Sequence, residues 1–251
     1  QIKGKIFDYL ACGAFCLTDS NPELARFLPD GTHVTFSDSA NCIARIEYYL
    51  RHAAEREKIA ALYQAGCRYL QIDETNFPFL CDPKLHDHVR SIGEDPVSIQ
   101  KTYAKLLNDV TRGRPADLRI CIHMCRGNHE SSWVASGGYE PVAEVAFGTL
   151  DVDGFFLEYD TDRAGGFEPL RHLSGNKVAV LGLVTTKKPA LESKDALKRR
   201  IEEATKHIAL DQLCLSPQCG FSSTVHGNDI AVESQAAKLR LVIDVAREIW
   251  G

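Results

Sequence analysis

The sequence has few methionines and no long apolar segment. Its only methionine is Met124, and the chain begins at Gln1, so we expect these 251 residues to be part of a longer gene product. No apolar run approaches the roughly 20 residues that a membrane-spanning helix needs. The N-terminal stretch QIKGKIFDYL lacks the apolar core and cleavage site of a secretory signal. These absences argue against a membrane partner and against secretion.

Basic clusters and glycine-rich phosphate loops are also missing. With 29 Lys and Arg against 34 Asp and Glu, the formal net charge is -5, and no basic cluster is interleaved with aromatic residues. This balance argues against a nucleic-acid partner, whose phosphates select basic surfaces. The chain has no Gly-x-Gly-x-x-Gly after a strand, no P-loop and no Gly-x-Ser-x-Gly elbow. A dinucleotide-binding fold, a nucleotide triphosphatase and a serine hydrolase are therefore disfavoured.

Cysteine is plentiful, but its pattern is not that of a disulfide framework. The nine cysteines are odd in number and include no Cys-x-x-Cys pair. Several lie in apolar, strand-like runs, namely Cys67, Cys121 and Cys214. This usage predicts reduced thiols and a cytoplasmic protein.

The chain after residue 50 alternates short apolar runs with amphipathic stretches. The strand-like runs are 68–74, 118–125, 153–160, 177–185 and 211–220. The helix-like stretches are 51–65, 96–111, 140–149, 191–209 and 231–249. Apolar strands separated by helices are typical of a parallel sheet covered by helices. Without a dinucleotide fingerprint, we predict an α/β fold of the (β/α)8 TIM-barrel type, with residues 1–251 forming a single domain.

The first 50 residues fit this pattern less well. They contain an Asn-Pro, a Pro-Asp-Gly turn and a short run at 32–36, but no clean βαβ unit. A complete barrel needs about three strands more than the five recognised above. We therefore expect N-terminal strands of the barrel to be missing from this chain or altered in it.

Carboxylates, an imidazole and thiols gather where the predicted strands end. In chain order these residues are Asp73, Glu74, His123, Cys125, Glu158 and Cys219. The carboxyl ends of all barrel strands converge on one face, which is where barrel enzymes place their chemistry. Four separate regions of the chain would therefore deliver these groups to one mouth.

His123 and Cys125 are separated by one residue, so on a strand their side chains point to the same side. They lie about 6.6 Å apart along the strand, which lets them bind one ion if they lean together. Imidazole and thiolate are ligands that zinc favours. Adding Glu158 and Cys219 gives two thiolates and a carboxylate around a dication. Such a zinc is a poor Lewis acid for water but keeps a bound thiolate nucleophilic, and its carboxylate ligand could leave to admit a substrate sulfur.

Several of these residues also have ordinary structural explanations. The His-x-Cys motif alone is a weak signal. Glu158 could pair with Arg126 or Arg163, and Cys219 could pack beside a tight turn. Cys121, on the same face as His123, is better explained as a small buried hydrophobic residue.

Other charged residues also have both a structural and a functional explanation. Asp73 and Glu74 could stabilise the start of the helix-like segment that follows them. The polar stretch 82–88, which holds two histidines, is better explained as a solvated loop than as a second metal site. Lys187 follows a strand end, so it could face the pocket and bind an anionic group.

Four motifs in one order resemble a known family. The segments YLQIDE, IHMCRGN, DGFFLEYD and LSPQCGF resemble the C-terminal catalytic barrel of cobalamin-independent methionine synthase. The segments RGNHESSWVASGGYEP, RAGGFEPLR and VLGLVTTKKPALES are more similar to the shorter, single-barrel methionine-synthase-like proteins of bacteria. The resemblance covers roughly residues 50 to 250 and is specific because the motifs occur in the family's order.

The resemblance implies a zinc-dependent methyltransferase with a small thiol and a methyl donor, such as a folate, as its partners. In that family zinc activates the thiol of homocysteine for attack on a methyl group, which gives methionine. The family's zinc ligands correspond here to His123, Cys125, Glu158 and Cys219. The aspartate of its QIDE segment holds the amino group of the substrate, which implies this role for Asp73, with Glu74 beside it.

Three features depart from the full-length synthases. Their His-Ser-Pro segment, near the presumed proton donor, is replaced by Thr-Thr-Lys-Lys-Pro at 185–189, without a histidine. Their duplicated N-terminal barrel has no counterpart here, and the strand motifs that contact the amino acid's carboxylate are not visible in residues 1–50. A related zinc enzyme opens epoxides with coenzyme M. Two alternatives therefore stay open: alkyl transfer from another electrophile, and a thiol- or zinc-binding protein without catalysis.

Overall fold

The computed structural model describes residues 17–19, 34–36, 53–128, 131–222 and 227–251. In the N-terminal part, β1 (Leu17–Asp19) pairs in parallel with β2 (Val34–Phe36), which covers part of the predicted run at 32–36. The turns expected in the first 50 residues lie outside the described residues.

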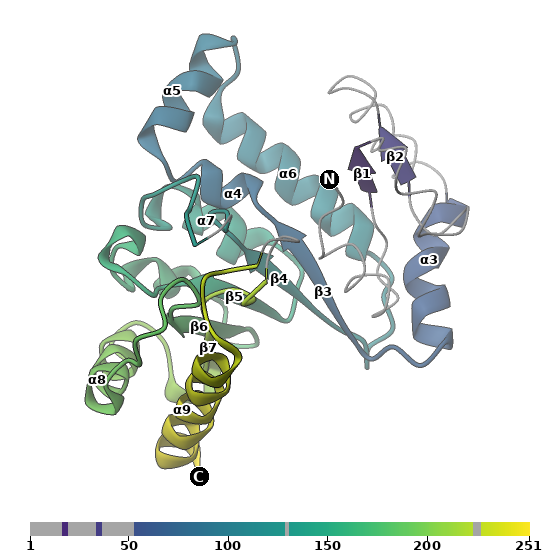
Figure 1. Ribbon diagram of the computed structural model, residues 1–251. Coiled ribbons are helices and arrows are strands. Elements are labelled where there is room, and N and C mark those ends of the chain that lie inside the picture. Colours follow the sequence, from purple (N-terminus) through teal and green to yellow (C-terminus); the bar gives the residue numbers. More distant parts are fainter. Residues whose placement is uncertain (1–16, 20–33, 37–52, 129–130, 223–226) are drawn as a thin grey trace.

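The described part is built on a five-stranded parallel sheet whose strands follow one another in sequence order (Figure 1). The strands are β3 (Tyr69–Glu74), β4 (Arg119–Met124), β5 (Gly154–Glu158), β6 (Val178–Val184) and β7 (Leu213–Pro217). Because the order never reverses, right-handed crossovers place every connecting helix on the same side of the sheet, as in a barrel. A doubly wound sheet would reverse its order at a switch point. The described strands form five consecutive strands of the predicted barrel and do not close it by themselves.

Helices connect these strands and cover the sheet. They are α3 (Ala53–Gln64), α4 (Asn76–Phe79), α5 (Pro83–Ser91), α6 (Pro96–Thr111), α7 (Glu140–Thr149), α8 (Lys194–Ala204) and α9 (Val232–Trp250). Short 3-10 turns lie at η2 (Asp162–Ala164), η3 (Glu168–His172) and η4 (Leu210–Gln212). Within the described ranges, no helix is long and apolar enough to cross a membrane.

Local sequence signals account for several helix boundaries. Asp95 accepts a hydrogen bond from the backbone N–H of Ser98 at the start of α6, as an N-cap residue does. Gly66 ends α3 with a φ of 103°, a conformation that favours glycine. The prediction of a solvated loop at 82–88 is wrong, because most of this stretch lies in α5. Its cap is the side chain of Asp82, and a proline occupies its first turn.

The two faces of β4 serve different purposes. Ile120, Ile122 and Met124 are fully buried and belong to the hydrophobic core, which also contains residues of the covering helices. Alternate side chains of a strand point to opposite faces. Cys121 and His123 therefore face away from the helices, toward the interior of the barrel.

Candidate metal centre

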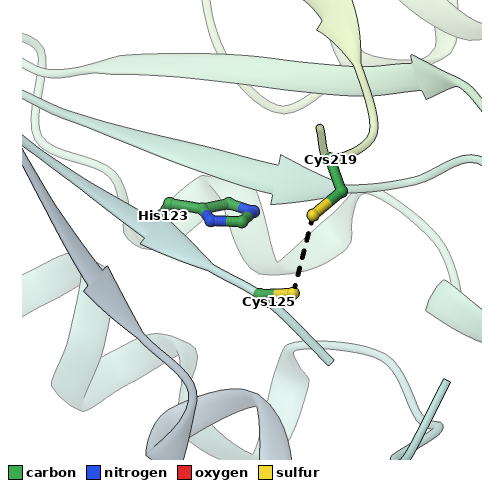
Figure 2. A group of neighbouring side chains, drawn as sticks. All are labelled: His123, Cys125 and Cys219. Atoms are coloured by element: carbon green, nitrogen blue, oxygen red, sulfur yellow. Dashed lines mark hydrogen bonds between the residues drawn. The ribbon is translucent and has the colours of Figure 1, made fainter. Parts of the chain in front are cut away.

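Three side chains meet at the carboxyl end of the sheet, as Figure 2 shows. His123 lies on β4, Cys125 follows directly after it, and Cys219 lies in the turn after β7. Their ligand atoms all lie within 4.8 Å of one another. The two sulfur atoms are 3.9 Å apart. An imidazole and two thiols this close form a donor set that suits zinc, whose bonds to such ligands are about 2.0 to 2.3 Å long.

The imidazole of His123 is oriented by a carboxylate. Its Nδ1 lies 2.6 Å from Oδ1 of Asp73, the residue beside it on the neighbouring strand. Its Nε2 is buried without a hydrogen-bond partner among the described residues. A neutral imidazole that donates from Nδ1 presents the lone pair of Nε2 to a metal. Burial opposes the charged imidazolium, but Asp73 and Cys219 outweigh burial and raise the pKa of His123 to about 9. These acidic neighbours favour a positive charge at His123, and a metal ion that binds Nε2 would displace a proton from it.

Glu158 lies beside this group, at the end of β5. Its Oε1 is 3.7 Å from Sγ of Cys125 and accepts a hydrogen bond from Nε2 of Gln218. Its Oε2 accepts a hydrogen bond of 3.1 Å from the backbone N–H of Arg126 and lies 3.5 Å from Nη2 of Arg163. The arginine contacts that the sequence offered as an alternative to metal binding are thus present. The carboxylate of Glu158 therefore contacts the arginines and also lies beside Cys125, one of the candidate ligands.

Arg126 ties the loop after β4 to the end of β5. Its fully buried guanidinium donates hydrogen bonds to the carbonyl oxygens of Gly137 and Glu158 and to the hydroxyl of Tyr139. The Tyr139 hydroxyl in turn accepts a hydrogen bond from the backbone N–H of Glu158 and donates one to the carbonyl of Met124. Sequence reasoning considered Arg126 only as a partner of the Glu158 carboxylate. The wider network was missed because Tyr139 is separated from both strands in the sequence.

The two acidic residues at the end of β3 have different surroundings. The carboxylate of Glu74 accepts hydrogen bonds from the backbone N–H groups of Asn76 (2.8 Å) and Phe77 (2.9 Å), so it stabilises the start of α4. Burial raises the pKa of Glu74 to about 7, although these two hydrogen bonds act to lower it. The side chain of Asp73 is 20% exposed. The substrate-binding roles implied for Asp73 and Glu74 stay predictions.

Gln218 is a residue of the site that sequence reasoning did not single out. It lies between Pro217 and Cys219, is buried, and bonds to both Glu158 and Lys187. The anion-binding role considered for Lys187 gains no support, because its ammonium donates to the carbonyl of this glutamine. The sequence signal that could have identified Gln218 is its position directly before Cys219, a candidate ligand.

Two family models match the chain. One, described as "Cobalamin-independent synthase, Catalytic domain", matches residues 39–248. The other, described as "Glycosyl transferase-like", matches residues 1–71, most of which lie outside the described residues. The first model therefore covers most of the chain and all of the candidate metal centre.

Relatives among known proteins agree with that match. The uncharacterized protein YxjH of Bacillus subtilis (strain 168) is 50% identical over 198 residues, which are 78% of this chain and 52% of that protein. A 5-methyltetrahydropteroyltriglutamate–homocysteine methyltransferase of Bacillus licheniformis is 24% identical over 79% of this chain and 23% of its own length. This chain thus spans about half the length of its Bacillus subtilis relative.

Solved structures confirm the fold class. The putative vitamin-B12 independent methionine synthase of Listeria monocytogenes aligns with a TM-score of 0.66 at 34% identity, over 100% of this chain and 71% of that one. A B12-independent methionine synthase of Shewanella sp. W3-18-1, in complex with selenomethionine, aligns with a TM-score of 0.61 at 16% identity, over 99% of this chain and 67% of that one. The second likeness shows the fold alone. From the family model and the Listeria structure together, we conclude that this chain belongs to the cobalamin-independent methionine synthase family.

Proposed function

We propose that the protein is a zinc-dependent methyltransferase that moves a methyl group from a donor to the sulfur of homocysteine, giving methionine. The observation that carries this proposal is the group formed by His123, Cys125 and Cys219, whose ligand atoms lie within 4.8 Å of one another. Membership of the family supports methyl transfer to a thiol. The acceptor is inferred from the Bacillus licheniformis relative, whose name specifies homocysteine.

The chain's own residues would hold the metal and keep it oriented. His123, Cys125 and Cys219 are the proposed ligands, with Glu158 as the proposed fourth because its Oε1 lies 3.7 Å from the sulfur of Cys125. Zinc bound there would lower the pKa of a substrate thiol and keep its sulfur nucleophilic. Asp73, 2.6 Å from Nδ1 of His123, fixes the ring so that Nε2 is the nitrogen left for the metal.

The reaction itself needs little from the protein beyond positioning. The thiol gives up its proton to the solvent, and the sulfur's electron pair forms the new S–C bond as the donor's bond to the methyl group breaks. The leaving group keeps the electron pair of the broken bond. Asp73 is the proposed partner of the substrate's ammonium, since its side chain is 20% exposed at the end of β3. Arg126 and Arg163 both contact the buried carboxylate of Glu158, so positive charge lies beside it.

A metal analysis tests the ligand assignment. The purified protein should contain close to one zinc per chain, and Cys125→Ser and Cys219→Ser should each lose most of it. Cys121→Ser is the matched control, because Cys121 is also a buried thiol on β4 but lies outside the three-residue group. Full zinc content in both ligand variants would refute the assignment.

A transfer assay tests the reaction. The zinc-loaded protein should move a labelled methyl group to homocysteine from one donor of a panel that includes methylfolates and simpler methyl compounds. Binding of homocysteine without methylation by any donor would refute the methyltransferase proposal in favour of a binding protein.

One observation favours a second candidate, alkyl transfer from an electrophile other than a folate. The segment 185–189 replaces the His-Ser-Pro of the full-length synthases. Lys187 in this segment is buried and bonded to Gln218, so it does not stand in for an accessible histidine acid. An electrophile whose leaving group needs no protonation would suit such a site. Turnover with epoxides or alkyl sulfonium compounds, but not with methylfolates, would favour this candidate.

A further inference from the structure

A chain of buried polar side chains leads from the loop after β6 to the carboxylate of Glu158. The ammonium of Lys187 donates a hydrogen bond of 2.7 Å to Oε1 of Gln218, and the hydroxyl of Thr186 donates one of 3.1 Å to the same oxygen. The Nε2 of Gln218 then donates to Oε1 of Glu158. All four side chains are buried, with Lys187 7% exposed and Gln218 3% exposed. One hydrogen-bond donor to Glu158 is therefore Gln218, whose carbonyl oxygen accepts a hydrogen bond from Lys187.

Lys187 determines which way the amide of Gln218 faces. A lysine ammonium has three donors and no acceptor, whereas a threonine hydroxyl can both donate and accept. If the amide rotated by half a turn, its NH₂ group would face the ammonium and its carbonyl would face the carboxylate of Glu158. Both new contacts would be repulsive in a buried site, where unmatched polar groups are costly. The hydroxyl of Thr186 alone would tolerate either orientation.

The backbone on both sides of this chain is held in place. The backbone N–H of Gln218 donates to the carbonyl of Val184 (2.8 Å), which fixes the turn that carries the neighbouring Cys219. On the other side, the carboxylate of Glu192 accepts hydrogen bonds from the backbone N–H of Thr185 and from the fully buried ammonium of Lys238 on α9. The turn that carries Gln218 and the loop that carries Lys187 are therefore both held by further hydrogen bonds.

We propose that Lys187 is a positioning residue: through Gln218 it fixes the orientation of Glu158 at the metal centre. This inference rests on the proposed function, because it concerns the same zinc site. Lys187 does not touch the metal group. It acts by keeping a donor aimed at the oxygen of Glu158 that lies 3.7 Å from the sulfur of Cys125.

Zinc affinity, measured on the full chain by competition with a chromophoric chelator, tests the proposal. Lys187→Met should weaken zinc binding roughly tenfold, the lower end of the effect that outer partners of metal ligands have. Gln218→Leu should weaken it at least as much. Adding Lys187→Met to Gln218→Leu should cause no further loss, because the lysine acts only through the glutamine. Lys188→Met is the matched control, since this neighbouring lysine is exposed, and its zinc affinity should equal that of the wild type.

A second readout separates positioning from a merely structural role. In cobalt-substituted protein, the visible absorption bands report the arrangement of the ligands, and they should shift in Lys187→Met but not in Lys188→Met. A residue that only stabilised the fold would lower the free energy of unfolding and leave the bands of the loaded protein unchanged.

The outcomes are distinct. Wild-type protein that binds no zinc refutes the proposed function and this inference with it. Wild-type protein that binds zinc, with a Lys187→Met variant equal to it in affinity and cobalt spectrum, refutes only the role of Lys187, as do additive losses in the double variant. If Lys187→Met does not fold, Lys187→Gln carries the test, because its amide can both donate and accept and therefore no longer fixes the orientation of Gln218. This variant should bind zinc roughly threefold more weakly, and unchanged affinity would refute the proposal.

Discussion

The buried carboxylate of Glu74 should make the stability of the protein depend on pH near neutrality. The residue is 6% exposed, and burial raises its pKa to about 7 from an ordinary value of 4.5. At about 1.4 kcal/mol per pH unit, this difference corresponds to about 3 kcal/mol between the fully protonated and fully ionised limits. Because the pKa is higher in the folded state, the stabilisation is complete below pH 4.5 and is lost as the pH rises through 7.

Glu74→Gln removes this titration and leaves a side chain of nearly the same shape. Between pH 5 and pH 8, the free energy of unfolding of the wild type should fall by about 2.5 kcal/mol relative to that of the variant. Urea denaturation at pH 5, 6, 7 and 8 measures both curves. The result that would refute the reasoning is a constant difference between wild type and Glu74→Gln across this range.

Glu140 is a control, because its pKa is shifted in the opposite direction to that of Glu74. Its carboxylate is half exposed, and a hydrogen bond from Arg171 holds its pKa below the usual range. A lowered pKa gives stability that is present above the unfolded-state pKa and is lost only as the pH falls through the folded-state value. The difference between wild type and Glu140→Gln should therefore stay constant from pH 5 to pH 8.

Two further substitutions test the surroundings of the metal centre. Asp73→Asn should weaken zinc binding roughly tenfold or more, because it removes the charged partner of His123. A titration with homocysteine then tests its implied substrate role, which predicts a larger loss for homocysteine than for zinc, and equal losses would count against that role. Tyr139→Phe should lower the free energy of unfolding by about 1 to 3 kcal/mol, because it leaves the buried backbone N–H of Glu158 without its acceptor. Urea denaturation measures this loss, and an unchanged midpoint would contradict it.

The regular elements could be predicted because their signals are local. The helices observed at 96–111 and 140–149 begin and end where the sequence pattern placed them. The exceptions were the single-turn α4 and the short, polar α5, whose only large apolar side chains are Leu85 and Val89 and which has no buried residue. One apolar pair four residues apart is a weak signal for a helix, and the Asp82 cap and the following proline were its other indications. That residues 1–251 form a single domain stays a prediction, since most of the first 52 residues lie outside the described part.

The site was predictable in its position but not in its contacts. The carboxyl ends of parallel strands meet at one edge, so the strand-end residues could be grouped from the sequence. The bond between Asp73 and His123 requires the register of β3 against β4, in which these two residues are direct neighbours. Register depends on how whole strands pair, and no short motif encodes it. The orientation of Gln218 depends in the same way on a lysine in a different loop.

The distribution of charge predicts that the fold around the proposed zinc centre does not depend on the metal. Structural zinc sites often supply the energy that folds the surrounding chain. Here the carboxylate of Glu158 is already contacted by Arg126, Arg163 and Gln218, and the imidazole of His123 by Asp73. The buried charges are therefore matched by side chains of the protein itself. A donor set that is preformed in this way would be free to exchange a ligand for a substrate sulfur without loss of the surrounding structure, as the proposed catalytic zinc would require.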